Sequence, residues 1–189
     1  MYEVEVKVPA DLTAVRDRLE ALESDDAEPT SLGTVVQADT YYDAPHRSFP
    51  ETDEALRLRA ETWTAGGSEA VEETRITYKG PLLDDESKSR EEHETGVENG
   101  ETMDAVLTNL GFEAAATVRK ERERFSLEGY TVTLDAVDDV GEYVEVEREV
   151  EDEADLESAR EGAYEVLERL GLDSDDQIRT SYLGLLLDS

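Results

Sequence analysis

Charged residues alternate with apolar ones in several stretches of the sequence, beginning near its N-terminus. Residues 2–8 read Tyr-Glu-Val-Glu-Val-Lys-Val, so in an extended chain Glu3, Glu5 and Lys7 share one face and the apolar residues share the other. Carboxylates suit hard divalent cations, which prefer oxygen ligands. Lysine and arginine donate charge-assisted hydrogen bonds to phosphate oxygens. Both kinds of group on one face favour chemistry on a metal-bound polyphosphate.

The same alternation recurs farther along the chain, and the charged residues again share a face. The basic residues placed in this way are Lys7, Arg57, Arg59, Arg75, Lys79, Arg90, Lys120, Arg122 and Arg124. The acidic residues are Glu3, Glu5, Asp135, Glu145 and Glu147. A surface adapted to bulk water in so acidic a chain would be uniformly acidic. The mixed charge therefore predicts that these faces enclose a site.

The composition is extremely acidic, with 50 Asp and Glu against 18 Lys and Arg and a net charge of -32. Such a surface repels nucleic acid and anionic membranes, so neither is an expected partner. A folded chain of this kind is typical of a salt-accumulating, halophilic cell, in which high ionic strength screens the self-repulsion. Only four lysines remain, Lys7, Lys79, Lys88 and Lys120, and we expect each to have a specific role.

Several classes of protein are excluded or disfavoured by what the sequence lacks. It has no cysteine, which excludes disulfides, thiolate nucleophiles and cysteine-ligated metals. The start has no signal-peptide pattern and no apolar run reaches the roughly 20 residues that span a bilayer, so we expect a cytoplasmic protein. The length fits a single domain over residues 1–189. The oligomeric state stays open between a monomer and a homodimer.

Hydrophobic periodicity predicts an α+β chain. Strands are expected over residues 2–8, 32–42, 55–62, 72–79, 87–97, 117–127, 130–137 and 142–148, and helices over 11–23, 101–110, 156–170 and 178–187. Gly80 and Pro81 are expected to end the fourth strand, and Tyr182 to anchor the last helix. Helices covering the apolar faces would leave the charged faces inside a closed or nearly closed antiparallel barrel.

An ordered set of motifs resembles the CYTH superfamily, the triphosphate tunnel metalloenzymes. The set begins with Glu3-x-Glu5-x-Lys7 and covers nearly the whole chain. It continues with Asp39-Thr-Tyr-Tyr-Asp43, Leu56-Arg57-Leu58-Arg59, Tyr78-Lys79-Gly80-Pro81, Ser89-Arg90-x-Glu92-x-Glu94, Leu110-Gly111-Phe112, Lys120-x-Arg122, Leu134-Asp135, Gly141-x-Tyr143-x-Glu145-x-Glu147 and Ser181-Tyr182-Leu183. One such motif alone would be weak, whereas the ordered set is specific.

The resemblance implies a closed antiparallel tunnel of eight strands with helices packed outside, which binds a triphosphate and Mg²⁺ or Mn²⁺. Carried over by position, the metal ligands are Glu3, Glu5, Glu145 and Glu147, with Asp135 as a further or supporting ligand. The phosphate-binding residues are Lys7, Arg57, Arg59, Lys79, Arg90, Lys120 and Arg122. Glu3, Glu5 and Lys7 are the expected catalytic residues.

The implied reaction is that of a class IV adenylate cyclase, which converts ATP to cyclic AMP and pyrophosphate. The segment Leu110-Gly111-Phe112 followed by Lys120-x-Arg122 resembles that branch most. The alternatives are a phosphatase acting on inorganic triphosphate, thiamine triphosphate or a nucleoside triphosphate, and a non-catalytic module that binds polyphosphate or nucleotide. One sequence does not distinguish the cyclase from the phosphatase, because the same residues serve both, whereas the presence of all five acidic residues disfavours the non-catalytic module.

Other residues receive simpler interpretations. Arg75 and Arg124 share the predicted inner face but lie outside the clearest motifs. Trp63 is interpreted as a packing residue, and the alternative is that it stacks on a base or thiazole ring at the tunnel mouth. His46 and His93 lie in polar contexts without partners at zinc-ligand spacing, so surface roles are expected.

Overall fold

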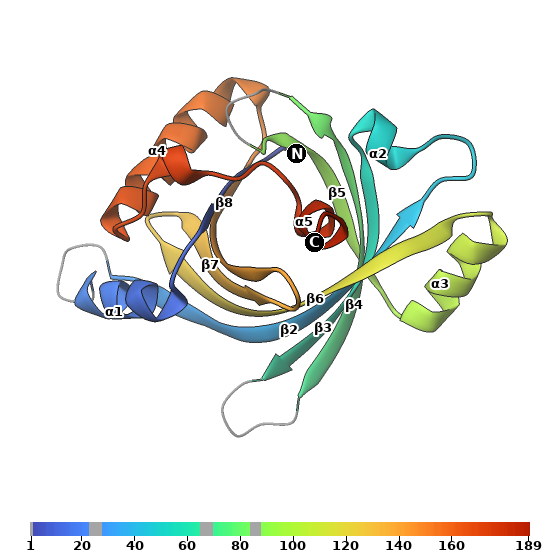
Figure 1. The fold of residues 1–189 in the computed structure, drawn as a ribbon, viewed down its shortest axis with the longest axis horizontal. Coiled ribbons are helices and arrows are strands. Elements are labelled where there is room, and N and C mark those ends of the chain that lie inside the picture. The colour runs from blue at the N-terminus through green and yellow to red at the C-terminus, as the bar shows by residue number, and fades with distance from the viewer. Residues whose placement is uncertain (1, 23–27, 65–69, 84–87) are drawn as a thin grey trace.

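Antiparallel strands close into a barrel that Figure 1 shows end-on. The computed structural model describes residues 2–22, 28–64, 70–83 and 88–189, and in them the strand order around the barrel is β1-β5-β4-β3-β2-β6-β7-β8. The strands are β1 (Tyr2–Pro9), β2 (Thr30–Asp43), β3 (Ala55–Thr64), β4 (Val71–Leu82), β5 (Arg90–Val97), β6 (Glu113–Leu127), β7 (Tyr130–Val137) and β8 (Gly141–Val150). The predicted eight-stranded antiparallel barrel with helices on its outside is confirmed.

The helices lie between and after the strands. They are α1 (Leu12–Leu22), α2 (Phe49–Thr52), α3 (Gly100–Asn109), α4 (Leu156–Arg169) and α5 (Tyr182–Leu187), with short 3-10 turns η1 (Glu153–Asp155) and η2 (Ser174–Asp176). None of the helices in the described ranges has the length and apolarity needed to cross a membrane.

The main hydrophobic core lies outside the barrel wall, between the wall and two helices. Val6 and Val8 of β1 are buried against Leu19 of α1 and Leu167 of α4. Side chains alternate along a strand, so burying these valines outward turns Glu5 and Lys7 inward. The orientation predicted for the two faces of the first strand is therefore confirmed: helices cover its apolar face, and its charged face lies in the barrel interior.

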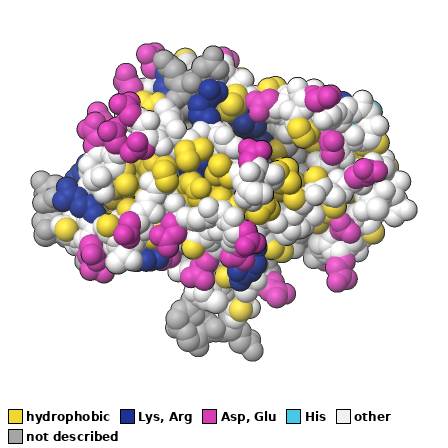
Figure 2. All heavy atoms as spheres, in the orientation of Figure 1, with side chains coloured by type: hydrophobic (Ala, Val, Ile, Leu, Met, Phe, Trp, Pro, Cys, Tyr) yellow, Lys and Arg dark blue, Asp and Glu magenta, His cyan; other side chains and the backbone are white. Residues whose placement is uncertain are grey.

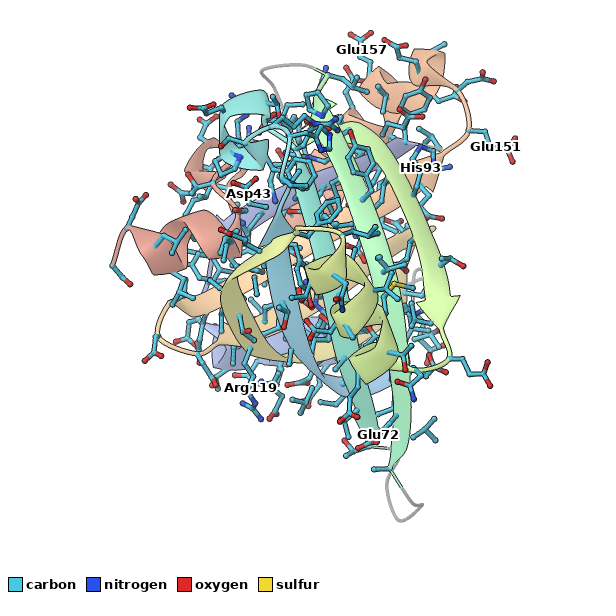
Figure 3. The ribbon with its side chains drawn as sticks, turned by 90° about the vertical axis from the view of Figure 1, so that its right-hand side faces the viewer. Asp43, Glu72, His93, Arg119, Glu151 and Glu157 are labelled. Carbon is cyan, nitrogen blue, oxygen red and sulfur yellow. The ribbon has the colours of Figure 1, made fainter. Side chains whose placement is uncertain are left out.

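A second cluster covers the opposite part of the wall. Leu107 of α3 packs with Tyr42 of β2 and Leu58 of β3, and Figure 3 shows α3 lying across the outer face of the strands. The N-cap of α3 is Asn99, whose side chain accepts a hydrogen bond from the Thr102 amide at 2.8 Å. The helix predicted over residues 101–110 is thus confirmed within one residue at each end.

Several elements differ from the sequence-based expectation, and one of them is β6, which starts at Glu113 rather than at residue 117. Strand β4 passes Gly80 and Pro81 and ends at Leu82, because a register shift between Lys79 and Leu82 accommodates a residue that has no amide hydrogen. Helix α5 starts later than expected, since Ser181 caps it by accepting from the Gly184 amide. The four-residue α2 is too short to give a periodic pattern. The predicted loops at 66–68 and 84–86 lie outside the described residues.

Helix α5 lies at one mouth of the barrel rather than against the outer wall (Figure 1). Tyr182 packs with Val118 within β6, with Val137 at the end of β7 and with Tyr143 near the start of β8, and these residues lie at this mouth. In the space-filling view from this side, yellow side chains gather at the centre of the face and acidic side chains surround them (Figure 2). The other mouth is formed by the opposite ends of the strands, where Trp63 and Arg124 lie, and is called the far mouth below.

Candidate active site

A cavity of about 960 Å³ occupies the barrel interior. Its lining includes the inward-facing Glu5 of β1, Arg59 of β3, Lys120 of β6 and Glu145 of β8. Volumes of several hundred Å³ are typical of small-molecule sites, so the cavity has room for a nucleoside triphosphate. Unlike most such sites, its wall is dominated by ionised groups.

Three carboxylates form the group best placed to hold a cation. Glu5, Glu145 and Glu147 each offer an oxygen, and these oxygens lie within 4.8 Å of one another. The pairing of β1 with β8 explains this, because Glu5 is opposite Glu147 and Lys7 is opposite Glu145. An all-oxygen set of this kind fits Mg²⁺ or Mn²⁺.

The electrostatics of the three carboxylates differ. Burial raises the pKa of Glu147 to about 7, and Glu3, Glu145 and Glu5 add to the rise against the opposing effect of Arg122. Glu145 is also buried, but Arg122 lies against it and lowers its pKa to about 2. Like charges in a buried cluster resist ionisation together unless a cation joins them. The chemistry of this donor set therefore fits a divalent ion.

Two other predicted ligands are placed elsewhere. Glu3 accepts a hydrogen bond from Lys79 Nζ at 2.8 Å, and the lysine offsets burial and lowers the pKa of Glu3 to about 2. Asp135 accepts two hydrogen bonds from Arg122, at 2.6 and 2.5 Å, and a third from the Tyr182 hydroxyl at 2.8 Å. Both carboxylates are thus satisfied by side chains and lie outside the three-carboxylate group.

The predicted phosphate-binding residues come together along the wall of the cavity. Arg57 and Arg59 lie on β3, Lys79 on β4, and Lys120 and Arg122 on β6. Arg59 makes two parallel hydrogen bonds to Asp39, both 2.7 Å, and Arg57 lies 3.6 Å from the same carboxylate. Guanidinium groups held in this way are oriented before any phosphate arrives, which lowers the cost of binding.

Two more predicted residues lie apart from this wall, and of the two only Arg90 lines the cavity. Lys7 is buried at the α5 mouth and donates to the Thr180 carbonyl at 2.6 Å, while its ammonium lies 4.2 Å from the centre of the Tyr182 ring. Burial and the charge of Lys88 lower the pKa of Lys7 to about 7. Arg90 lies at the rim, where it donates to the Gly80 carbonyl at 3.0 Å.

Some residues of the cavity were not assigned to it from the sequence. Lys88 donates to Glu5 at 2.5 Å, and Asp39 pairs with the two arginines of β3. The scarcity of lysine was a signal for Lys88, and the position of Asp39 opposite Arg59 could be found only from the strand register. Tyr182 does anchor α5, as expected, but it also lines the cavity. His93 is exposed on β5, in agreement with the surface role expected for it (Figure 3).

The chain matches known proteins over almost its full length. The model of the CYTH domain family matches residues 1–182. A Methanocaldococcus jannaschii protein whose name gives it provisionally as an adenylate cyclase is 34% identical over 186 residues, 98% of each chain.

Solved structures of other proteins share this fold. A Pyrococcus horikoshii protein is 34% identical, with a TM-score of 0.85 over 98% of both chains. A Hippeastrum protein, described as a provisional adenylyl cyclase with a dominant triphosphatase activity, shares the fold at 17% identity, with a TM-score of 0.62 over 99% of this chain and 95% of its own. The chain belongs to the CYTH family.

Proposed function

We propose that this protein is a divalent-metal-dependent enzyme that acts on a triphosphate inside the barrel, and that its reaction is the cyclisation of ATP to cyclic AMP and pyrophosphate. The observation that carries the proposal is one enclosed cavity in which three clustered carboxylates face buried lysines and arginines. The provisional name of the 34% identical relative supports the choice of reaction.

The side chains divide into two groups by charge. Glu5, Glu145 and Glu147 would hold Mg²⁺ or Mn²⁺, while Arg57, Arg59, Lys79, Lys120, Arg122 and Lys7 would bind phosphate oxygens, with Arg90 at the rim. A divalent ion bound to the carboxylates supplies a Lewis acid that polarises a phosphate and lowers the pKa of an attacking hydroxyl. Glu3 and Asp135 would keep Lys79 and Arg122 in position.

In the cyclisation, the ribose 3′-oxygen forms a bond to the α-phosphorus and the bond from that phosphorus to the bridging oxygen of pyrophosphate breaks. Negative charge accumulates on the departing pyrophosphate. The buried guanidinium and ammonium groups stabilise this charge inside the barrel, where shielding from bulk water makes such interactions stronger than in solution. Asp39, Glu3 and Asp135 orient Arg59, Lys79 and Arg122 through hydrogen bonds within the protein.

Hydrolysis of inorganic triphosphate, thiamine triphosphate or a nucleoside triphosphate is the second candidate. The same cations and carboxylates serve it, with water in place of the ribose hydroxyl and the terminal phosphorus as the target. The dominant triphosphatase activity stated for the Hippeastrum protein supports hydrolysis as the alternative reaction. A module that binds without turnover is the third candidate, and the presence of all five predicted acidic residues argues against it.

The test is to incubate the protein in high salt with Mn²⁺ and, separately, ATP or inorganic tripolyphosphate, and to identify the products. Matched reactions with excess chelator control for metal-independent turnover. Cyclic AMP with pyrophosphate is the expected result. Orthophosphate from tripolyphosphate, without cyclic AMP from ATP, would replace the cyclase by the hydrolase. Metal-dependent binding without any product would refute both enzymatic functions.

A further inference from the structure

A buried amide lies between the phosphate-binding wall and the far mouth. Gln37 of β2 is 3% exposed, lines the cavity and donates from Nε2 to Glu61 of β3 at 2.6 Å. A carboxylate only accepts hydrogen bonds, so the amide nitrogen must face Glu61 and the amide oxygen must face away. Among the residues that the structure describes, no group donates to Gln37 Oε1. The fixed orientation leaves one acceptor, which a ligand with a suitable donor would satisfy.

The hydrogen-bonding capacity that this amide keeps for a ligand is that acceptor and its second N–H. The other oxygen of Glu61 faces Arg75 Nε at 3.5 Å, so the carboxylate is balanced on both sides. An acceptor beside an N–H matches a base edge that pairs an amino group with a ring nitrogen, as the edge of adenine with its 6-amino group and N7 does. The corresponding edge of hypoxanthine or guanine offers two acceptors, O6 and N7, and would leave Gln37 Oε1 without a donor.

A flat platform lies next to the amide. Arg124 of β6 stacks over the Trp63 ring, with 5.6 Å between its guanidinium carbon and the ring centre, and both half-buried side chains line the cavity. Trp63 pairs with Val35, two residues before Gln37, so its backbone is about 7 Å from that of the Gln37–Glu61 pair along the strand. Aromatic rings and guanidinium planes are the surfaces on which nucleobases stack.

The platform and the amide are continuous with the phosphate-binding wall. Gln37 is paired with Lys120 across β2 and β6, and Val35 is paired with Arg122 in the same way. A base at the platform would therefore have its ribose and phosphates directed toward these two cations. We infer that Gln37, Trp63 and Arg124 form a nucleobase subsite selective for adenine, which would make an adenine nucleotide the ligand of the proposed triphosphate site. The inference rests on the proposed function.

The test compares ligands that differ in one feature. Calorimetric titrations with Ca²⁺ present, followed by a check for product, would give dissociation constants for ATP, ITP and inorganic tripolyphosphate. ITP carries an oxo group in place of the 6-amino group of ATP, and tripolyphosphate has no base. We expect the native protein to bind ATP about 10-fold more tightly than ITP. We also expect ATP, and not tripolyphosphate, to change the fluorescence of Trp63, the sole tryptophan.

Two variants separate hydrogen bonding from stacking. In Gln37→Leu the dissociation constants for ATP and ITP should differ by less than 2-fold. In Trp63→Leu the dissociation constant for ATP should rise about 10-fold, while that for tripolyphosphate changes less than 2-fold. Arg124→Ala and Arg148→Ala remove the same charge near the far mouth, but Arg148 lies over Tyr130 instead. Only Arg124→Ala should weaken the binding of ATP relative to that of tripolyphosphate. Unchanged tripolyphosphate binding reports that each variant is folded.

The results distinguish failure of the subsite from failure of the site as a whole. Equal affinity of the native protein for ATP and ITP, or equal losses of ATP and tripolyphosphate binding in Trp63→Leu, would overturn the subsite and leave the proposed triphosphate site intact. Failure of the native protein to bind tripolyphosphate or ATP at all would overturn both.

Discussion

Asp39 is the carboxylate whose loss should reveal most about the proposed phosphate-binding arginines. It is 1% exposed, accepts two 2.7 Å hydrogen bonds from Arg59 and lies 3.6 Å from Arg57. Burial raises its pKa, but the charges of Arg59 and Arg57 outweigh burial and hold the pKa well below the usual range. Asp39→Asn keeps the shape and one acceptor, and leaves the two buried arginines without their shared counter-charge.

The expected cost follows from that geometry. Breaking a buried ion pair by removing one partner costs about 3–5 kcal/mol. The retained amide oxygen and the nearby Glu92 and Glu94, at 3.9 and 3.8 Å from Arg57, favour the lower end, about 3 kcal/mol. For a chain of 189 residues this lowers Tm by about 6–12 °C in a thermal melt. Asp138→Asn is the matched control, because its pair with Arg119 is half exposed and contributes less than about 1 kcal/mol.

The same variant tests the phosphate-binding role of the arginines. If Arg57 and Arg59 bind phosphate, tripolyphosphate replaces the missing carboxylate, so saturating tripolyphosphate should raise Tm more in Asp39→Asn than in the native protein. A native-like Tm without ligand would refute the inferred ion-pair energy. Equal stabilisation of both proteins by tripolyphosphate would refute the assignment of these arginines to the phosphate site.

Three further outcomes are expected. Glu5→Gln should abolish metal-dependent turnover with the fold intact by circular dichroism, and near-native activity with Mg²⁺ or Mn²⁺ would remove Glu5 from the metal ligands. Because the pKa of Glu147 is raised to about 7, protons compete with metal below that pH, so Mn²⁺ should raise Tm more at pH 8 than at pH 6; equal shifts would contradict a role for Glu147. The net charge of -32 predicts a higher Tm in molar KCl than in dilute buffer, and salt-independent melting would argue against a halophilic origin.

The barrel was predictable from the sequence because strand alternation is a local property. Val4, Val6 and Val8 could only be buried outward if Glu5 and Lys7 turned inward, and the same reasoning applies to Leu58 and Arg59 of β3. Strand ends were less predictable. Strand β4 passes Pro81 because a register irregularity occurs there, and such an irregularity depends on the neighbouring strand rather than on the local sequence.

The detailed site was predictable only in part, because alternation gives the face of a residue and not its height in the barrel. Glu3 and Glu5 share a face, yet Glu5 lies with Glu145 and Glu147 while Glu3 lies with Lys79. The difference arises from the pairing of three strands, which no single stretch encodes. Gln37 was missed for another reason. It carries no charge, and only its buried environment distinguishes it from a surface glutamine.

The pairing of Arg122 links the proposed metal and phosphate sites. Its guanidinium bridges Asp135 and Glu145, and Glu145 also belongs to the three-carboxylate group. A cation coordinated by Glu145 would weaken the ion pair between Glu145 and Arg122, so the guanidinium would be more available to bind a phosphate oxygen. A phosphate that engages Arg122 in turn leaves Glu145 freer to bind a cation. Coupling between two ligands is reciprocal, so each should tighten the binding of the other through this one arginine.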